Sequence, residues 1–330
     1  MTLRLARPFL AAALAAACLA ALPAGPAFAQ DGPWPSKPVR IVVPFPPGGA
    51  ADTFARLIAE HAGKSLGQPV VADNRPGAGG QIATDFVAKA PADGHTMLVV
   101  TVGHAVNPSL YPKLPYDTLV DLAPVARIAD LPSVLVVNPE VPAKTVQELL
   151  ALMKAKPDGL AYASSGNATT SHVAGAMLAA QAGVKALHVP YKGSAPAITD
   201  LIGGQVQWMI DPVLSSAQHV KSGKLRALAV STAKRSNVVP GLPTIAESGL
   251  PGYDFAAWFV LLAPAKTPPA VVERMHREVE RILALPEVKE RFVQLGAEPG
   301  SGTPAQVGAF LAAEVRRYQA VVRDAGMKAD

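Results

Sequence analysis

The clearest hydrophobic pattern is the run Val39–Val43, which gives way at once to prolines and glycines. Its nearly continuous β-branched character predicts a strand buried on both faces, as in a parallel sheet. Pro44, Pro46 and Pro47 end that strand, and Gly48 and Gly49 permit a tight turn with exposed N–H groups. Apolar residues from Phe54 to Leu66 then recur at helical spacing. This strand, turn and helix start favour an anion site, although the same corner could bind nothing.

The alternation of apolar strands and amphipathic helices continues along the chain and predicts an α/β fold with mostly parallel sheets. Turns rich in glycine, serine or threonine follow strands at four places, residues 44–52, 74–81, 164–172 and 191–194. Such turns lie at the carboxyl edge of an α/β sheet, where ligands bind. The four turns are therefore expected to surround one site.

Several helix starts carry capping signals. Thr145–Glu148 and Thr303–Gln306 both fit the capping box, and Thr244–Glu247 could cap a short helix. Asp52 is interpreted first as an N-cap, with a ligand contact or loop-orienting role as the alternative. Ser194 is expected to cap a helix that ends near Gly203.

The first 29 residues read as a secretory signal peptide, with Arg4 and Arg7 ahead of an apolar segment over 9–22. The small-residue site that ends at Ala29 predicts cleavage after that residue and export to the periplasm. Cys18 is the chain's only cysteine, so the mature protein would have no disulfide and no cysteine ligand. Lipid attachment at Cys18 is the second interpretation.

Composition excludes several classes of function. The formal net charge of +5 comes without a basic run, which argues against a nucleic-acid partner. The seven histidines show no metal-binding spacing, so no metal is predicted. Gly77–Gly80 resembles half of a dinucleotide-binding motif, but Ile82 occupies the place of the next glycine. No cofactor is therefore predicted.

Hydroxyl side chains cluster over 164–171, directly before a predicted helix. They could donate hydrogen bonds to a carboxylate or simply cap the helix. Ser165 or Ser171 paired with His172 would make an exported hydrolase of carboxylates or esters the alternative function. The chain has no G-x-S-x-G motif and no acid placed to orient the imidazole, so an enzyme is not predicted. Asp211 ends a strand at the same sheet edge and is interpreted as a pocket residue or a turn residue.

Together these stretches carry a family resemblance that covers essentially the whole chain after the leader, in order. The motifs are Trp34-Pro35-x-Lys37-Pro38, Val43-Pro44-Phe45-Pro46-Pro47-Gly48-Gly49-x-x-Asp52, Asn74-Arg75-Pro76-Gly77-Ala78-Gly79-Gly80, Ala90-Pro91-x-Asp93-Gly94, Asn107-Pro108-x-Leu110-Tyr111, Leu114-Pro115-Tyr116-Asp117, Tyr162-Ala163-Ser164-Ser165-Gly166-Asn167, Val189-Pro190-Tyr191-Lys192-Gly193 and Pro243-Thr244-x-x-Glu247-x-Gly249. The chain resembles the Bug, or TctC-like, family of periplasmic solute-binding proteins of tripartite tricarboxylate transporters.

The resemblance implies a two-domain, type II periplasmic-binding fold with the ligand in a cleft between the domains. Residues 30–130 and 254–330 would form one domain, and 131–253 the other. The implied ligand is a small organic anion, such as a di- or tricarboxylate, an amino acid or an aromatic acid. A monomer would deliver it to membrane permease subunits, and a sensor role in a two-component system is a further alternative.

The ligand-binding residues follow from the positions that match the family's motifs. They are Phe45, Pro46, Gly48, Gly49, Asp52, Gly79, Gly80, Thr101 and His104 in the first domain, and Ser164, Ser165, Asn167, Thr169, His172, Tyr191 and Asp211 in the second. Helix N-termini and hydroxyls, rather than a basic side chain, are expected to neutralise the ligand.

Overall fold

The computed structural model describes residues 34–157, 159–236 and 239–328. The chain separates into two compact units, Met1–Ser36 and Lys37–Asp330, and the elements below belong to the second. The predicted cleavage after Ala29 and the alternative lipid attachment at Cys18 lie outside the described residues. Within those residues, every helix is too short or too polar to cross a bilayer.

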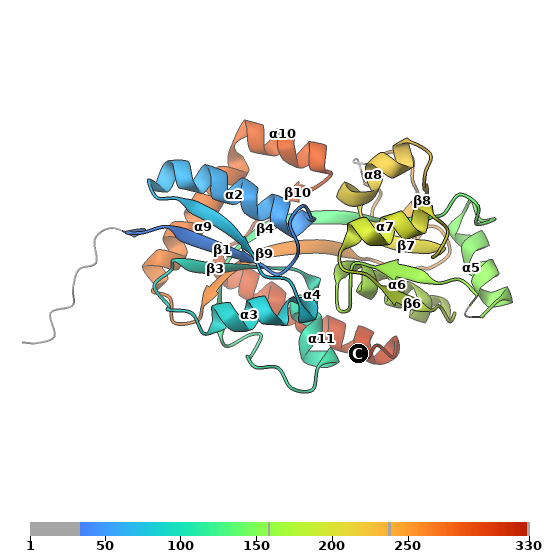
Figure 1. Cartoon of the computed structure of the whole chain (residues 1–330), viewed down its shortest axis with the longest axis horizontal. Coiled ribbons are helices and arrows are strands. Elements are labelled where there is room, and N and C mark those ends of the chain that lie inside the picture. The colour runs from blue at the N-terminus through green and yellow to red at the C-terminus, as the bar shows by residue number, and fades with distance from the viewer. Residues whose placement is uncertain (1–33, 158, 237–238, 329–330) are drawn as a thin grey trace, which may run out of the picture. The chain divides into compact units, whose positions relative to one another are not determined.

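The described residues form a ten-stranded mixed sheet (Figure 1). Its order is β2-β1-β3-β9-β4-β7-β5-β6, and β8 and β10 also pair with β4. The strands are β1 (Val39–Val43), β2 (Val70–Asn74), β3 (Thr96–Val100), β4 (Leu122–Val137), β5 (Tyr162–Ser164), β6 (His188–Pro190), β7 (Trp208–Pro212), β8 (Arg226–Val230), β9 (Ala256–Pro264) and β10 (Glu298–Pro299). Pairing is parallel at the two ends of the sheet, as predicted. It is antiparallel in the centre, where β4 and β9 run against their neighbours, which the pattern did not predict.

The long strand β4 joins two half-sheets. Its residues from Leu122 to Pro132 pair with β9, and its residues from Ser133 to Val137 pair with β7 and β8. The chain crosses again near Phe255, whose N–H donates to the Ser231 carbonyl. The first half-sheet therefore contains β1, β2, β3, β9 and β10 with the start of β4, and the second contains β5, β6, β7 and β8 with its end.

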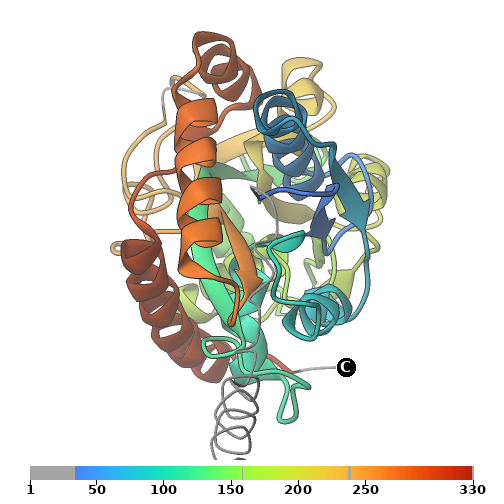
Figure 2. The ribbon, with the colours of Figure 1, turned by 90° about the vertical axis from the view of Figure 1, so that its left-hand side faces the viewer.

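Helices cover both faces of each half-sheet. They are α2 (Ala50–Leu66), α3 (Gln81–Ala88), α4 (Val102–Leu110), α5 (Val146–Ala155), α6 (Thr170–Ala182), α7 (Ser194–Ile202), α8 (Val213–Lys221), α9 (Pro269–Ala284), α10 (Pro286–Leu295) and α11 (Pro304–Asp324), with the short 3₁₀ turn η1 (Ala78–Gly80). The two ribbon views place α2 and α10 on one face of the first half-sheet and α3 and α11 on the other (Figures 1 and 2).

Apolar packing differs between the two faces. On the α3 and α11 face, one continuous core runs through both half-sheets, from Val42 and Leu311 to Trp208. On the opposite face, the second half-sheet has its own cluster around Met209 under α7 and α8. The first half-sheet there packs Phe54 against the rings of Phe259 and Phe292 at centroid distances of 4.9 and 5.2 Å. Aliphatic and aromatic side chains thus hold the halves together on one face.

Candidate functional site

A cavity of about 650 Å³ lies between the second half-sheet's cluster and the Phe54 group. Phe259 and Leu295 line it from the first half, and Ile198 lines it from the second. This volume falls within the range of about 300–1,000 Å³ that is typical of small-molecule sites. We call this space the helix-end cavity, because helix starts make up most of its polar wall.

In the described chain, five helices begin at this cavity: α2, α4, α6, α7 and α8. Their N-cap residues all line it, namely Gly49, Thr101, Thr169, Gly193 and Pro212. None of these described N-caps accepts a capping hydrogen bond with its side chain from a backbone N–H of its own helix. The first N–H groups of a helix have no partner within it, and the aligned peptide dipoles make that end positive. The wall therefore presents hydrogen-bond donors and partial positive charge to an anion.

The helices α5 and α11, which begin elsewhere, have the side-chain caps that the helices at the cavity lack. Thr145 and Thr303 cap α5 and α11 with complete capping boxes, as the sequence predicted. Neither residue lines the helix-end cavity. In α5 and α11 the capping box satisfies the amide of the third helical residue, whereas no N-cap side chain does so for the helices at the cavity, which leaves more of their first amides for a ligand or solvent.

The turn between β1 and α2 is held from behind by Asp52. This side chain lies at the third position of α2, so its prediction as the N-cap is wrong; Gly49 is the N-cap. Its carboxylate accepts from the N–H of Gly48 at 2.9 Å, from Arg56 Nε at 3.0 Å and from Asn74 Nδ2 at 2.9 Å. Burial raises the pKa of Asp52, but these hydrogen bonds outweigh it, and the pKa stays below its ordinary value.

The turn between β5 and α6 supplies hydroxyl groups to the cavity. Ser165 and Thr169 line the cavity, and the Ser171 hydroxyl accepts from the Ser165 N–H at 2.8 Å. The Thr169 hydroxyl donates to the Gly166 carbonyl at 2.6 Å, which closes the turn before the helix starts. The local sequence combines small and hydroxyl residues because the backbone must fold tightly while its polar groups stay paired.

Asp211 organises the turn before α7 and the start of α8 from beneath. Its buried carboxylate accepts from the Ser194 hydroxyl at 2.9 Å and from the Ser216 hydroxyl at 3.3 Å. Gly193 is the N-cap of α7, so the prediction that Ser194 caps this helix is wrong. Among the described residues the partners of Asp211 are hydroxyls and not a cation, so burial raises its pKa to about 7, although the serine hydrogen bonds lower it.

Three basic side chains also line the cavity, and sequence reasoning missed them as site residues. They are Lys192 in the turn before α7, His219 on α8 and Arg291 on α10. Lys192 lies inside a turn that the sequence had singled out. His219 and Arg291 lie late on their helices, where no local motif marks them. Lys192 and Arg291 place cationic groups at the cavity in addition to the helix ends.

Seven of the predicted binding residues line the helix-end cavity: Phe45, Pro46, Gly48, Gly49, Thr101, Ser165 and Thr169. The other predicted residues do not line it. His104 is buried and contacts the Thr118 carbonyl through Nε2 at 3.2 Å, and Tyr191 donates from its hydroxyl to Asp200 at 2.8 Å. Ser164 donates to the Gly166 carbonyl at 3.1 Å. Asp52 and Asp211 support the cavity wall from behind, as described above.

Two further predicted residues, Gly79 and Asn167, meet where the two half-sheets are in contact. A Cβ atom on Gly79 would lie 3.2 Å from the Asn167 carbonyl oxygen, and one on Gly103 would lie 2.8 Å from the Ala168 carbonyl oxygen. A Cβ atom on Gly80 would lie 3.2 Å from Cβ of Pro44, which belongs to the same half-sheet as Gly80. The turn of the second half thus meets backbone of the first half where only glycine leaves room.

The geometry does not assemble the hydrolase alternative. His172 Nδ1 accepts a hydrogen bond from the Ala168 N–H at 3.1 Å, and the described residues give His172 no hydrogen bond to a serine. The Ser165 and Ser171 hydroxyls contact each other at 3.0 Å instead. Burial, with a contribution from His188, lowers the pKa of His172 to about 3. A general base for serine needs a hydrogen bond to the nucleophile and a pKa nearer neutrality.

Within the described residues, no group of three or more His, Cys, Asp or Glu side chains could hold a metal ion. Residues Ala78–Gly80 form η1, and Gly79 lies against backbone of the other half-sheet, so this glycine serves backbone contact in this structure.

Comparison with known proteins gives consistent matches. Residues 54–327 match the tripartite tricarboxylate transporter family receptor, TctC. The chain is 40% identical to protein BugT of Bordetella pertussis over 297 residues, which is 89% of this chain and 91% of that protein.

Two solved structures with similar folds carry carboxylate ligands. Rpa4515 of R. palustris with adipate has a TM-score of 0.85 and 39% identity, covering 89% of this chain and 99% of that one. MatC (Rpa3494) of Rhodopseudomonas palustris with bound malate has a TM-score of 0.83 and 35% identity, covering 88% and 100%.

Proposed function

Because the chain belongs to the tripartite tricarboxylate transporter receptor family, we propose that it captures a small organic dicarboxylate in the helix-end cavity for delivery to a membrane permease. The family is one of periplasmic solute-binding receptors, and the adipate and malate of the two similar structures are both dicarboxylates. The proposal assigns to this chain the same class of ligand.

One observation carries the proposal: five helix N-termini without side-chain caps line a single cavity within the described chain. One carboxylate of the ligand would accept hydrogen bonds from the first amides of α2 and α6, assisted by the hydroxyl of Ser165. The second carboxylate would lie toward the basic side chains, Lys192, His219 and Arg291. This arrangement favours a doubly charged ligand over a neutral one.

We further propose that the two half-sheets are the cores of two lobes, which correspond to residues 37–130 with 254–330 and to residues 131–253. The chain passes between the half-sheets at Ser133 and near Phe255, and the Ser231 hydroxyl bridges these crossings. Short crossing segments of this kind can act as hinges. Ligand bound to both lobes stabilises the closed arrangement only, so binding shifts the equilibrium toward closure.

A ligand screen tests the proposal directly. Thermal unfolding and calorimetry would be measured with malate, succinate, adipate and citrate, and with a neutral diester as control. A ligand at 100 times its Kd stabilises the folded state by about 2.7 kcal/mol, which moves the melting temperature by several degrees. We expect at least one dicarboxylate to do so and the diester to have no effect. If no carboxylate raises the melting temperature, the proposed function is wrong.

A further inference from the structure

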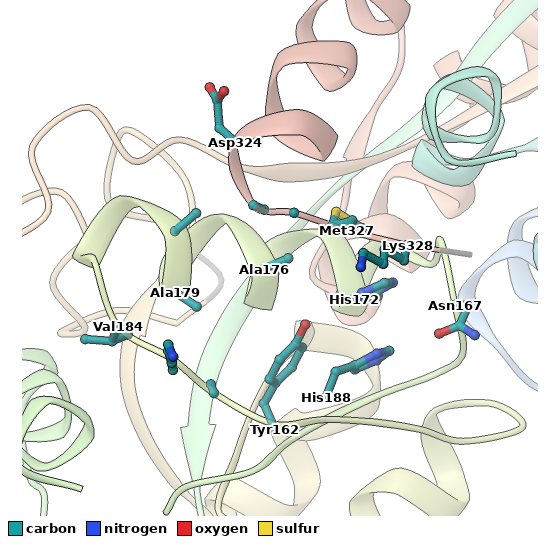
Figure 3. A pocket seen from close by; sticks show the side chains of 15 residues that line it. Tyr162, Asn167, His172, Ala176, Ala179, Val184, His188, Asp324, Met327 and Lys328 are labelled. Atoms are coloured by element: carbon teal, nitrogen blue, oxygen red, sulfur yellow. The ribbon is translucent and has the colours of Figure 1, made fainter. Parts of the chain in front are cut away.

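A second cavity, of about 460 Å³, lies behind the turn that joins β5 to α6 (Figure 3). Its polar end is formed by Tyr162, His172 and His188, and α6 forms one wall. The end of α11 and the residues that follow it, Asp324 to Lys328, cross over the cavity. We call this space the histidine cavity. It is separate from the helix-end cavity and shares none of its lining residues.

The two histidines at the polar end are stacked face to face. Their ring centroids are 3.9 Å apart with planes 2° from parallel, and the Tyr162 ring lies 4.9 Å from His188. The Ser164 hydroxyl lies 2.6 Å from His188 Nε2. Because Ser164 donates its proton to the Gly166 carbonyl, it accepts from His188, which places the proton of His188 on Nε2.

His172 presents a hydrogen-bond donor to this cavity. Its Nδ1 accepts the Ala168 N–H, so the proton of the neutral ring lies on Nε2. The side chain is 5% exposed and lines the cavity, and within the described residues Nε2 has no partner. Because His172 lines the cavity, this N–H is available to a ligand that accepts a hydrogen bond from it.

The rest of the wall defines what kind of molecule fits. Ala176, Ala179, Val184 and Met327 give it an apolar side. Lys185 and Lys328 bring two ammonium groups, and Figure 3 shows Lys328 reaching toward the His172 end. Among the described residues that line the cavity, the one acid is Asp324, which is already paired with Arg323 at 2.8 Å. The surroundings therefore suit an anion with an apolar body.

We propose that the histidine cavity is a second ligand site, which takes a small monocarboxylate with an apolar body. The carboxylate accepts from the Nε2–H of His172 and is neutralised by Lys328. The apolar body packs against Ala176, Ala179 and Met327. Two imidazoles alone do not make a metal site, and the described residues supply no third ligand.

The two cavities share one turn. Ser165 and Thr169 line the helix-end cavity, whereas Asn167 and His172 line the histidine cavity. The Ala168 N–H connects them, because it donates to His172 while the Ala168 carbonyl meets Gly103 of the other half-sheet. An occupant of the histidine cavity therefore fixes the turn that a dicarboxylate would contact. This coupling rests on the proposed function, whereas the second site itself does not.

Benzoate is a suitable probe, and its binding to the full mature chain can be measured by calorimetry. We expect a Kd on the order of 0.1–1 mM, as befits about nine non-hydrogen atoms in a small cavity. Ala179→Leu would fill the space and weaken benzoate binding at least tenfold. Ala313→Leu makes the same change on the outer surface of α11 and would leave benzoate binding unaltered. Gly49→Val, which fills the helix-end cavity, would also leave it unaltered.

The binding results test the second site, its coupling to the helix-end cavity and the proposed function separately. Benzoate binding that is lost in Gly49→Val but kept in Ala179→Leu, or that is absent in the wild type, overturns the second site. A dicarboxylate Kd that changes about fivefold or more in saturating benzoate supports the coupling, and an unchanged Kd overturns it. Failure of every dicarboxylate to bind, with benzoate binding intact, would end the proposed function and leave the second site standing.

Discussion

Asp52→Asn should weaken ligand binding although this side chain does not line the helix-end cavity. The carboxylate is 3% exposed and receives hydrogen bonds from Gly48, Arg56 and Asn74. An asparagine can accept with only one oxygen and places an NH₂ group against one of these donors. Gly48 or Asn74 then loses its partner, and the glycine turn at the cavity is released.

The size of the effect follows from the bonds that are lost. A hydrogen bond to a charged group contributes about 1.5–3 kcal/mol, and the Arg56 pair adds little because Arg56 is half exposed. We therefore expect the free energy of unfolding to fall by about 2–3 kcal/mol. A loosened turn that costs about 1.4 kcal/mol of binding free energy would weaken affinity tenfold.

Urea unfolding and calorimetry with the best dicarboxylate of the screen measure both effects. Arg56→Gln is the matched control, because it removes the cation and leaves the carboxylate with its Gly48 and Asn74 bonds. It should lower affinity less than twofold. The wild type should also lose this contribution as pH falls through the depressed pKa of Asp52, since a protonated carboxyl cannot accept from all its donors. Unchanged affinity in a destabilised Asp52→Asn protein would refute the reasoning.

Three further substitutions test other parts of the account. Gly49→Val should weaken dicarboxylate binding at least tenfold, because the valine methyls would enter the cavity. The protein should stay folded, because the new Cβ would meet only the Pro46 carbonyl at 3.9 Å. Calorimetry measures the affinity, and circular dichroism checks the fold. Asp211→Asn should remove a pH dependence of stability. Because the pKa of Asp211 is raised to about 7, the wild type loses a few kcal/mol of stability as pH rises from about 4 to 7. Urea titrations should therefore show that the stability of the variant relative to the wild type increases from pH 5 to pH 8. Gly175→Ala should destabilise the protein by about 1–3 kcal/mol, since the new Cβ would lie 2.5 Å from the Tyr162 ring; an unchanged melting temperature would show that this ring can move aside.

The parts of the fold that local chemistry dictates could be predicted from the sequence. The buried strand β1, the glycine turn after it and the capping boxes of α5 and α11 all appear as expected. Thr244 and Glu247 do exchange capping hydrogen bonds, but the residues that follow form turns and not the suggested helix. The family resemblance read from the motifs is confirmed by the match over residues 54–327.

The central strand could not be predicted in full, because its pattern contradicts the usual rules. Only Val134–Val137 reads as a strand, yet β4 begins at Leu122. Proline weakens a strand prediction, and Pro124 and Pro132 both lie within β4. Pro124 stands at a register shift, and Pro132 lies where β4 passes from β9 to β7. The paired partners, which are distant in sequence, override the local signal here.

The helices α4 and α8 were missed for a related reason. Gly103 and Pro108 lie inside α4, and both residues disfavour helix. Gly103 is explained by its contact with Ala168 of the other half-sheet, which no local pattern reveals. The same holds for the site: the turns that carry its amides are local and could be found, whereas Arg291 reaches the cavity only through the packing of α10.

The most direct test of the central claim is the affinity of one triple variant for the best dicarboxylate. The claim is that peptide N–H groups at helix ends, more than basic side chains, hold the ligand. Lys192→Gln, His219→Gln and Arg291→Gln combined remove the basic side chains that line the cavity in the described residues. Calorimetry should then show a Kd raised by less than about tenfold, since exposed charges contribute little. A loss of a hundredfold or more would contradict the account and assign the ligand to those side chains.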